Sequence, residues 1–497
     1  MDHFDCEVLI VGLGPVGAAL AALLADAGVT SIAVEKDVSV YPLPRAAHFD
    51  HEIMRLFQQL GVADEVLSHA RPAPAYEFRA ADGRPLVHIP VSPRPAISGW
   101  ANGYMFNQPG LETALRARLS ASPLTQIRLG RRFESLAADA EGVTAVVAGP
   151  DGPETVRARY LVGCDGASSP VREALGGRLS SYGFDEPWLV IDAVVRPGGR
   201  VPDLNLQICD PARPTTCVLM GPGRHRWEFM LLPGETAEAV LGDDFIQDLL
   251  ADWDVGQAIG IDRKAVYRFH GLMAETWRAG RVLLAGDAAH QTPPFAGQGM
   301  CSGLRDAANL AWKLKAVLRE GAAEGLLDSY QAEREPNCRA YIELAIAMGR
   351  VVCTLDPEVA AQRDAQMLAQ RAAGALPLPP MAPPPLSTGV IAPGTAGSGS
   401  QFPQPWTEVN GERLGLDDVL GAGAWLIVDG PLPGAGQAPP SLRIVSLADP
   451  LLAPFRAALG AWLGEHDAAA VLVRPDRYVF GSGAAGELMR GYAAALG

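Results

Sequence analysis

The chain lacks the features that mark secreted, membrane-spanning or metal-clustered proteins. Its seven cysteines are scattered over 497 residues, and none stands in a Cys-x-x-Cys pair. This spacing favours reduced thiols and offers no metal-ligand pattern. No apolar run reaches the roughly 18–20 residues of a membrane helix, and the chain enters "CEVLIVG" without the pattern of a signal peptide. We therefore expect a cytoplasmic protein with no membrane partner and no bound metal.

Positive charge is also scarce. Lys and Arg together number 41 against 56 Asp and Glu, which gives a formal net charge of −15. A surface of this sign repels a phosphate backbone, so a nucleic-acid partner is not expected. A hydrophobic fraction of 48% and a charged fraction of 20% are typical of a globular protein, and the length predicts two or three domains.

The first 36 residues carry the pattern of a nucleotide-binding unit. "CEVLIVG" predicts a strand buried on both faces, "PVGAALAALLADAG" a helix, and "SIAVEK" a second, parallel strand. Gly12, Gly14 and Gly17 form G-x-G-x-x-G between strand and helix, and Glu35 ends the second strand. Such glycines allow a tight turn and close approach to a pyrophosphate, and the carboxylate accepts from a ribose. The pattern predicts dinucleotide binding, with FAD and NAD both open at this point.

A second glycine-rich segment follows a later strand. "GRVLLAG" predicts a strand, and "GDAAHQTPPFAGQGM", Gly286 to Met300, leads into the long helical pattern "CSGLRDAANLAWKL". Amide donors at a helix N-terminus form a site for electron-rich oxygens, and glycines let a planar ring lie against the backbone. Asp287, just after the strand, could accept from a ligand hydroxyl.

Three stretches together resemble a known family. "GLGPVG", "CDGASSPVR" and "GDAAHQTPPFAGQG" match, in this order, the fingerprints of the single-component flavoprotein aromatic hydroxylases, the para-hydroxybenzoate hydroxylase group. The resemblance covers roughly residues 5–345. "DPARPTT", "WEFMLLPGE" and the segment after Pro293 look most like the 3-(3-hydroxyphenyl)propionate hydroxylase branch.

The resemblance implies FAD as the cofactor, and it assigns particular residues to it. Gly12, Gly14 and Gly17 would approach the pyrophosphate, Glu35 the adenosine ribose, and Asp287 the ribityl chain. The complete set implied for the cofactor is Gly12, Leu13, Gly14, Pro15, Val16, Gly17, Glu35, Lys36, Arg45, Gln108, Asp165, Gly286, Asp287, Pro294, Gly297, Gln298, Gly299 and Met300. Gly166, Ser169 and Arg172 complete the second fingerprint, which in the family supports FAD and nicotinamide binding.

The activity implied by the resemblance is hydroxylation of a phenolic ring. The substrate would be a 3-hydroxyphenylpropionate-like or resorcinol-like compound, attacked through a C4a-hydroperoxide of the flavin, with O2 and NADH or NADPH as co-substrates. NADH is favoured because no basic cluster for a 2′-phosphate is apparent. A tailoring hydroxylase of a polycyclic aromatic polyketide and a non-catalytic flavin-binding protein are the alternatives. Either a monomer or a homodimer is compatible with the sequence.

A phenol of pKa near 10 needs help to lose its proton, so a base near the substrate is expected. His48 is the candidate, with a structural histidine as the alternative reading. The phenol hydroxylases carry an acid at a neighbouring position, where this chain has Ala47. His290 is read as structural, and Trp227 and Phe229, which alternate with Glu228, as core residues. Weaker candidates for pocket polarity are Tyr104, His225, Tyr267 and His270.

The predicted fold class is α/β: a Rossmann-like FAD-binding domain, an inserted antiparallel-sheet substrate domain, and a C-terminal thioredoxin-like module. Residues 1–75, 100–180 and 270–345 are assigned to the first, and residues 76–99 and 181–269 to the second. A helical extension covers 346–374, a Pro/Gly linker or surface strap 375–405, and the module 406–497. The module has no cysteine, which excludes dithiol chemistry.

Overall fold

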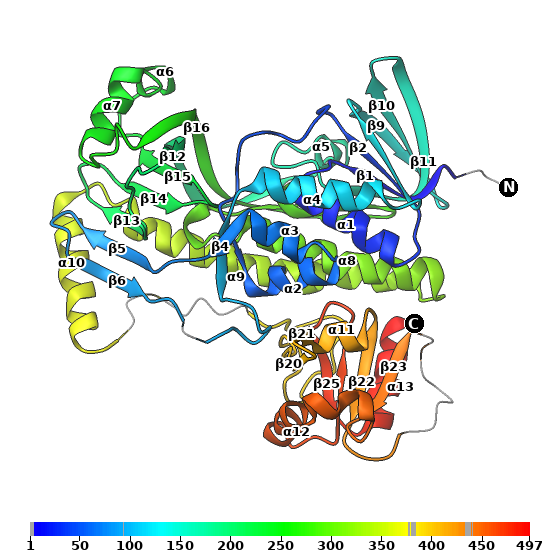
Figure 1. Ribbon diagram of the computed structural model, residues 1–497. Coiled ribbons are helices and arrows are strands. Elements are labelled where there is room, and N and C mark those ends of the chain that lie inside the picture. Colours follow the sequence, from blue (N-terminus) through cyan, green and yellow to red (C-terminus); the bar gives the residue numbers. More distant parts are fainter. Residues whose placement is uncertain (1–3, 93, 376–377, 379–383, 433–438, 440) are drawn as a thin grey trace.

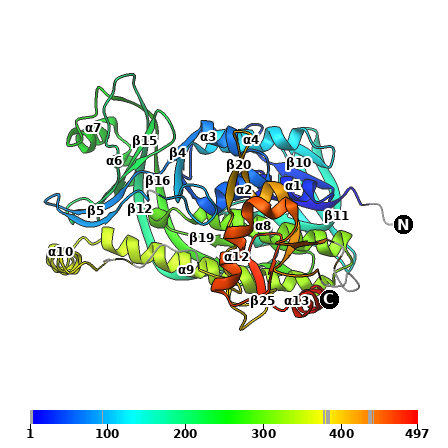
Figure 2. The same ribbon diagram turned by 60° about the horizontal axis from the view of Figure 1, so that its bottom comes forward.

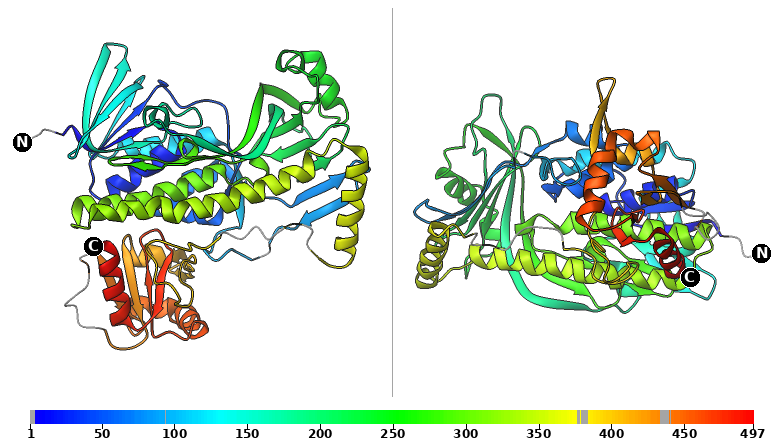
Figure 3. Two further views of the ribbon diagram at one scale, coloured as in Figure 1. Left: turned by 180° about the vertical axis from the view of Figure 1, so that it is seen from behind. Right: turned by 90° about the horizontal axis from the view of Figure 1, so that it is seen from below.

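The computed structural model describes residues 4–92, 94–375, 378, 384–432, 439 and 441–497. Two large sheets lie side by side above a pair of long helices, and a smaller α/β module packs beneath those helices (Figure 1). The mixed α/β class is therefore confirmed. Seen from below, the module lies under the first sheet and its helices, away from the second sheet (Figure 3).

The first sheet is built around five parallel strands, and the apolar residues of its central strands are buried. The predicted β-α-β unit is confirmed: β1 (Cys6–Val11) and β2 (Ser31–Glu35) are parallel and flank α1 (Pro15–Asp26) in sequence. The small residues of α1 allow close packing against α8 (Gly299–Arg319) and α4 (Gln108–Ser120). The strand order is β17 (Arg278–Ala279), β18 (Val282–Leu284), β11 (Gly152–Gly163), β1 (Cys6–Val11), β2 (Ser31–Glu35) and β8 (Thr125–Leu129), with β10 (Val143–Gly149) and β9 (Arg132–Ala138) continuing from β11.

The second sheet is mostly antiparallel, as the alternating sequence predicts. Its outer face packs on α6 (Ala237–Val240) and α7 (Asp243–Ala251), and Trp227 and Phe229 are buried there as core residues. Strands β13 (Asn205–Cys209) and β5 (Tyr76–Ala80) pair in parallel, contrary to the prediction, because β5 comes from a separate segment and no tight turn fixes its direction. The order is β19 (His290–Gln291), β16 (Ile259–Ala274), β12 (Leu179–Val195), β15 (Arg224–Met230), β14 (Thr215–Leu219), β13 (Asn205–Cys209), β5 (Tyr76–Ala80) and β6 (Pro85–Ile89).

Short elements between the two sheets carry the segment that contains His48. Strands β3 (His48–Asp50), β7 (Gly103–Phe106) and β4 (Ala70–Pro72) form a small sheet. Two helices, α2 (His51–Gln59) and α3 (Ala63–Ser68), connect β3 to β4. Asp50 caps α2 by accepting from the backbone N–H groups of Glu52 and Ile53, which fixes where β3 ends.

The helices after the first sheet run beneath it. After α8 come α9 (Asp328–Val352) and α10 (Pro357–Ala372), and α10 lies beside β6 (Figures 1 and 2). Short helix α5 (Pro170–Ala174) follows β11 and packs on β9. Within the described residues, no helix has both the length and the apolar composition needed to cross a bilayer.

The C-terminal module is a four-stranded sheet in the order β23 (Leu442–Ser446), β22 (Ala424–Val428), β24 (Ala470–Val473) and β25 (Val479–Gly483). The sequence predicts three strand-like runs, and the third folds as two strands because the chain turns at Arg477, whose φ is 67°. One face packs with α12 (Arg456–Glu465), and the other with α13 (Ala485–Leu496) and Trp312 of α8. A hairpin, β20 (Trp406–Val409) and β21 (Glu412–Gly415), and α11 (Leu416–Leu420) precede the sheet.

The predicted Pro/Gly linker is described from residue 384 onward, whereas 376–377 and 379–383 lie outside the described residues. Phe402 and Gln404 are buried, and the Gln404 side chain donates to Ser98 O at 2.9 Å. This part of the segment therefore behaves as a strap packed on the protein.

Candidate functional site

Four neighbouring strands of the first sheet end at one edge, and each end carries a polar or glycine motif. The parallel strands lie in the order β18, β11, β1 and β2. Asp287 follows β18, Asp165 follows β11, Gly12 follows β1, and Glu35 ends β2. The carboxyl edge of a parallel sheet is where such folds bind ligands. The structure thus brings the three sequence motifs together.

The three glycines of the first turn have different roles. Gly12 has φ 96°, and a Cβ there would lie 2.4 Å from Cys164 O; at Gly17 it would lie 2.0 Å from Gly12 O. These two glycines permit close contacts between backbones. A Cβ at Gly14 would meet nothing nearer than Arg45 Nη2 at 3.9 Å. Gly14 therefore leaves the N-terminus of α1 open to a ligand.

Carboxylates at these strand ends either hold the turn or remain free. Glu35 Oε2 accepts from the backbone N–H of Leu13 at 2.8 Å, which fixes the glycine turn against β2. Asp165 Oδ2 accepts from Val171 N at 3.0 Å, while its Oδ1 is buried and has no partner among the described residues. Burial raises the pKa of the Asp165 carboxyl. An orphaned acceptor of this kind fits a ligand that donates hydrogen bonds.

Asp287 is exposed although its neighbours Gly286 and Ala288 are buried. The surrounding protein raises the pKa of its carboxyl, an effect opposed by His290 and Arg45. Gly286, at φ 62°, leaves room for Val16, because a Cβ there would lie 3.0 Å from Val16 Cγ2. The turn after β18 is therefore packed onto α1 and presents Asp287 outward.

The segment before α8 forms a 3-10 turn, Pro294–Ala296, followed by Gly297 in the left-handed region at φ 62°. The His48 Nδ1–H donates to Gly297 O at 3.3 Å. A Cβ at Gly297 would lie 3.0 Å from His48 Nδ1, and one at Gly103 would lie 2.4 Å from Nε2. Burial lowers the pKa of His48. The neutral imidazole therefore lies between two backbone segments and supports the loop that begins α8.

Gln108 anchors the segment that carries Arg45. Gln108 Oε1 accepts from the backbone N–H of Arg45 at 3.2 Å and of Ala46 at 2.7 Å. The Arg45 carbonyl accepts from Arg226 Nη1 at 2.9 Å, while the Arg45 side chain is 56% exposed. The two sequence-predicted residues therefore lie together. Lys36, in contrast, is an exposed residue that pairs with Asp37.

His290 belongs to a buried polar cluster with Asp306 and Cys338, whose ligand-type atoms lie within 4.8 Å of one another. Asp306 Oδ2 lies 2.6 Å from His290 Nε2, and Oδ1 accepts from Arg334 Nε at 2.8 Å. The arginine already supplies the positive charge that a metal ion would bring. The geometry thus supports the structural reading of His290.

The weaker candidates do not converge. Tyr104 Oη accepts from Ala101 N, and His225 stacks on Trp227 in the outer core, 4.2 Å between ring centroids. His270 lies 3.4 Å from Asp185, and Tyr267 packs under Arg263. Sequence reasoning missed the charged residues on the inner face of the second sheet: Asp192, Arg226, Glu228 and Arg263. The sequence signal that could have found them is the alternation of Arg226 and Glu228 with the aromatic residues Trp227 and Phe229.

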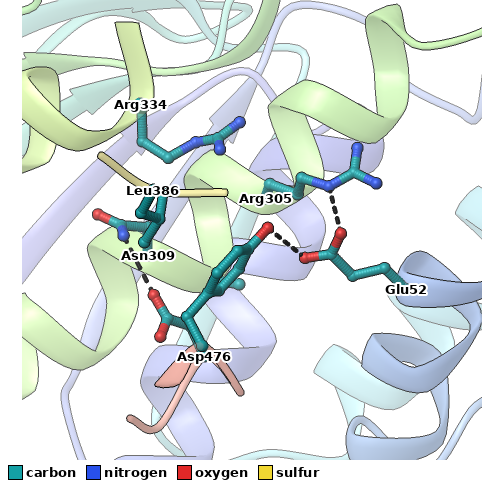
Figure 4. Close-up of a pocket in the computed structure, with 8 residues that line it drawn as sticks. Glu52, Arg305, Asn309, Arg334, Leu386 and Asp476 are labelled. Atoms are coloured by element: carbon teal, nitrogen blue, oxygen red, sulfur yellow. Dashed lines mark hydrogen bonds and ion pairs between the residues drawn. The ribbon is translucent and has the colours of Figure 1, made fainter. Parts of the chain in front are cut away.

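A small cavity of about 20 Å³, room for one water, lies at the junction with the C-terminal module. Figure 4 shows Arg305 and Glu52 facing each other across it, with Asp476 of the module below. Arg305 Nε donates to Glu52 Oε2 at 2.6 Å, and Tyr478 Oη donates to Glu52 Oε1 at 2.7 Å. The cavity lies within a charged interface between parts of the chain, away from the strand ends.

Comparison with known proteins agrees with this geometry. Residues 5–345 match the model of the family described as FAD binding domain. The chain is 40% identical over 495 residues to a probable NADH-specific resorcinol 4-hydroxylase of Rhodococcus jostii, covering 96% of this chain and 91% of that one. It is 34% identical to a 3-(3-hydroxy-phenyl)propionate/3-hydroxycinnamic acid hydroxylase of Klebsiella pneumoniae, covering 95% and 91%. A solved structure of aklavinone-11 hydroxylase with FAD and aklavinone aligns with a TM-score of 0.79 at 26% identity, covering 100% of both chains.

The chain therefore belongs to the FAD binding domain family. Within that family it is a flavin-dependent aromatic hydroxylase of the single-component type.

Proposed function

We propose that this enzyme hydroxylates the ring of a small phenol such as resorcinol or a 3-hydroxyphenylpropionate, with NADH as the electron donor. The phenol, O2, NADH and a proton would give the same ring with one further hydroxyl group, water and NAD⁺. The observation that supports this most is the open carboxyl edge at Gly14 and Asp287, in a chain similar over nearly its whole length to the resorcinol hydroxylase. The relative's NADH specificity favours NADH over NADPH.

The residues at the strand ends fit FAD. Gly14 and the N-terminus of α1 would take the pyrophosphate, Glu35 the adenosine ribose, and Asp287 the ribityl chain. Gly297 to Met300 would lie against the ring, and the orphaned Asp165 Oδ1 would accept from a bound hydroxyl or amine. When bound, FAD takes electrons from NADH and activates dioxygen. His48, through its hydrogen bond to Gly297 O, would position the loop that lies against the flavin ring. We favour this positioning role for His48 over a role as the catalytic base.

We also propose the domain division given by the sequence, with the second sheet as the substrate-binding domain and residues 406–497 as a thioredoxin-like module. One parallel pair, β22 with β23, and two antiparallel pairs, with a helix on each face, support that reading of the module. Without cysteine, the module would serve in packing and not in redox chemistry.

A polycyclic substrate is the second candidate, because the fold aligns over its whole length with aklavinone-11 hydroxylase. A panel of one-ring phenols and tricyclic phenols, scored by NADH consumption and product mass spectrometry, separates the two. We expect a product 16 Da heavier from resorcinol or 3-(3-hydroxyphenyl)propionate, the mass of one oxygen atom added (about 16). Turnover of tricyclic phenols alone would select the second candidate, and no product from any phenol would contradict both.

Gly14→Ala and Gly17→Ala are expected to fail in different ways. Gly14→Ala has room in the fold, so the free energy of unfolding without FAD should change little. Its methyl would stand where the pyrophosphate approaches, and we expect the Kd for FAD to rise at least about tenfold, roughly 1.4 kcal/mol. Gly17→Ala forces a Cβ to 2.0 Å from Gly12 O, so it should destabilise the protein itself by about 1–3 kcal/mol.

Titration of apoprotein with FAD, followed by flavin fluorescence, and urea unfolding of the apoprotein measure the two effects separately. Equal FAD affinity in Gly14→Ala and wild type would refute the placement of the pyrophosphate.

A further inference from the structure

The inner face of the second sheet carries a buried acidic residue, Glu228, that takes no part in the FAD site. Glu228, on β15, is 5% exposed and lies opposite Thr216 of β14 and Val190 of β12. Its strand neighbours Trp227 and Phe229 point to the outer core. Glu228 therefore points to the face that meets the flavin-binding part of the chain.

Contacts from this face reach the loop that precedes α8. The rings of Trp188 and Phe295 meet edge to face, 5.7 Å between centroids. Tyr76 Oη donates to Phe295 O at 3.1 Å. A hydrogen-bonded chain runs back from Tyr76 to the strand beside Glu228: Gln207 Nε2 donates to Tyr76 Oη at 2.8 Å, and Thr216 Oγ1 donates to Gln207 Oε1 at 2.7 Å. The polar groups of this face thus lie between Glu228 and the loop expected to hold the flavin ring.

The charges around Glu228 leave its carboxylate without a hydrogen-bond donor among the described residues. Arg226 donates to Asp192 Oδ1 at 2.7 Å and to the carbonyls of Pro44 and Arg45. Arg263 of β16 also faces Asp192, at 3.4 Å. The Glu228 carboxylate is 3.7 Å from Arg226 Nη1 and accepts no hydrogen bond from the residues that the structure describes. A buried acid without a hydrogen-bond donor is uncommon and points to a ligand.

The same surroundings set the titration of this acid. Burial raises the pKa of Glu228 to about 7, Arg226 opposes the rise and Asp192 adds to it. Other ionisable groups on this face include Arg263, Tyr267, Glu186, Cys209 and Tyr76. Burial raises the pKa of Tyr76 above its ordinary value. A carboxyl that changes charge near neutral pH is suited to general acid–base catalysis.

We propose that Glu228 is the catalytic base that takes the proton of the substrate phenol. The inference rests on the proposed hydroxylase function. The phenol O–H bond breaks, its electron pair stays on the oxygen, and the proton moves to a Glu228 carboxylate oxygen. The phenolate donates electron density to the ring carbon that is hydroxylated, and Glu228 returns a proton when the product leaves as a neutral phenol. Of the two candidates, His48 donates through Nδ1 to Gly297 O and has its Nε2 packed against Gly103, whereas the Glu228 carboxylate accepts no hydrogen bond from the described residues.

Glu228→Gln tests the inference, with Glu228→Asp as the conservative variant and Glu238→Gln, an exposed glutamate of α6, as the control. FAD content, the rate of flavin reduction by NADH, and the pH–rate profile of resorcinol hydroxylation are measured on each holoenzyme. In wild type the hydroxylation rate should fall as the pH drops below about 7, where the base becomes protonated.

In Glu228→Gln we expect FAD binding and flavin reduction within about twofold of wild type, while hydroxylation at pH 7 falls about 10²–10⁴-fold. The hydroxylation rate of Glu228→Gln should recover toward pH 10, where the phenol ionises unaided. Glu228→Asp should retain part of the rate and should still lose activity at acidic pH. If Glu228→Gln hydroxylates at the wild-type rate and shows the same decrease below about pH 7, the inference is overturned. If that variant loses FAD, a wild-type profile with no inflection near pH 7 overturns it instead. Absence of any hydroxylation by wild type would refute the proposed function, independently of the variants.

Discussion

Replacing Asp306 by alanine is expected to lower the free energy of unfolding by about 3–5 kcal/mol. Asp306 is fully buried and accepts from Gly286 N, His290 Nε2 and Arg334 Nε. Without the carboxylate, the buried Arg334 guanidinium would face no negative charge, and Gly286 N–H would lose its acceptor. Because Gly286 begins the turn that presents Asp287, FAD affinity should fall together with stability.

Urea unfolding of Asp306→Ala measures the change, with Asp185→Ala as the control. Asp185 pairs with Arg268 at the surface, where both side chains are more than half exposed, so its loss should cost at most about 1 kcal/mol.

The buried Asp306 carboxylate should also make the stability of the protein depend on pH. Burial opposes its charge, but His290 and Arg334 hold its pKa at about 2, below the ordinary 3.8. Its stabilisation is therefore present above about pH 4 and lost as the pH falls toward 2. Equal free energies of unfolding for Asp306→Ala and Asp185→Ala would contradict the stabilising role of Asp306.

Glu333→Ala should loosen the C-terminal module and lower the free energy of unfolding by a similar 3–5 kcal/mol. Glu333 on α9 lies between Lys313 of α8, at 2.9 Å, and Arg474 of the module, at 2.7 Å. All three side chains are fully buried. Glu333 Oε1 also accepts from Val390 N of the strap at 2.7 Å. Removal of this carboxylate leaves the buried Lys313 without its ion-pair partner, and Arg474 with Asp476 alone, at 2.6 Å.

Glu335→Ala, two residues further along α9, is the matched control. Glu335 makes a partly exposed i, i+4 pair with Arg339, worth roughly 0.5 kcal/mol. Urea unfolding followed by tryptophan fluorescence compares the two variants, and limited proteolysis near residue 384 reports whether the module has become detached. A Glu333→Ala protein as stable as Glu335→Ala would show that the module is held by its apolar contacts alone.

The sequence predicts the nucleotide-binding edge well because its first unit is local and the later strands join that unit by regular parallel pairing. The βαβ unit, the glycines and Glu35 lie within one stretch of chain, and parallel pairing then brings the ends of β1, β11 and β18 together. The parallel pairing of β5 with β13 and the split of the last strand run of the module were not predictable, because they depend on contacts between distant segments.

The buried charges escaped prediction for a different reason. Arg305, Asp306, Lys313, Glu333 and Arg334 occur in helical sequences where charge ordinarily marks a solvated face. Their partners come from other segments, such as Glu52 for Arg305 and Arg474 for Glu333, so only the assembled fold shows that these faces are covered. The burial of Glu228 was also not predictable, because an acidic residue between two aromatic residues on a strand is ordinarily expected to face solvent.

The attachment of the segment that carries Arg45 has a consequence for sequence divergence. Gln108 holds its peptide N–H groups, and Arg226 and Arg263 hold the carbonyls of Pro44 and Arg45. All of these bonds are made to the main chain. The path of this segment is therefore fixed largely through its backbone, and substitution of the exposed Arg45 side chain can alter what the segment offers to a ligand while these bonds remain. Ala46 is more restricted, because it packs against the core. Variation in substrate or donor preference can thus accumulate at position 45 at little cost to the fold.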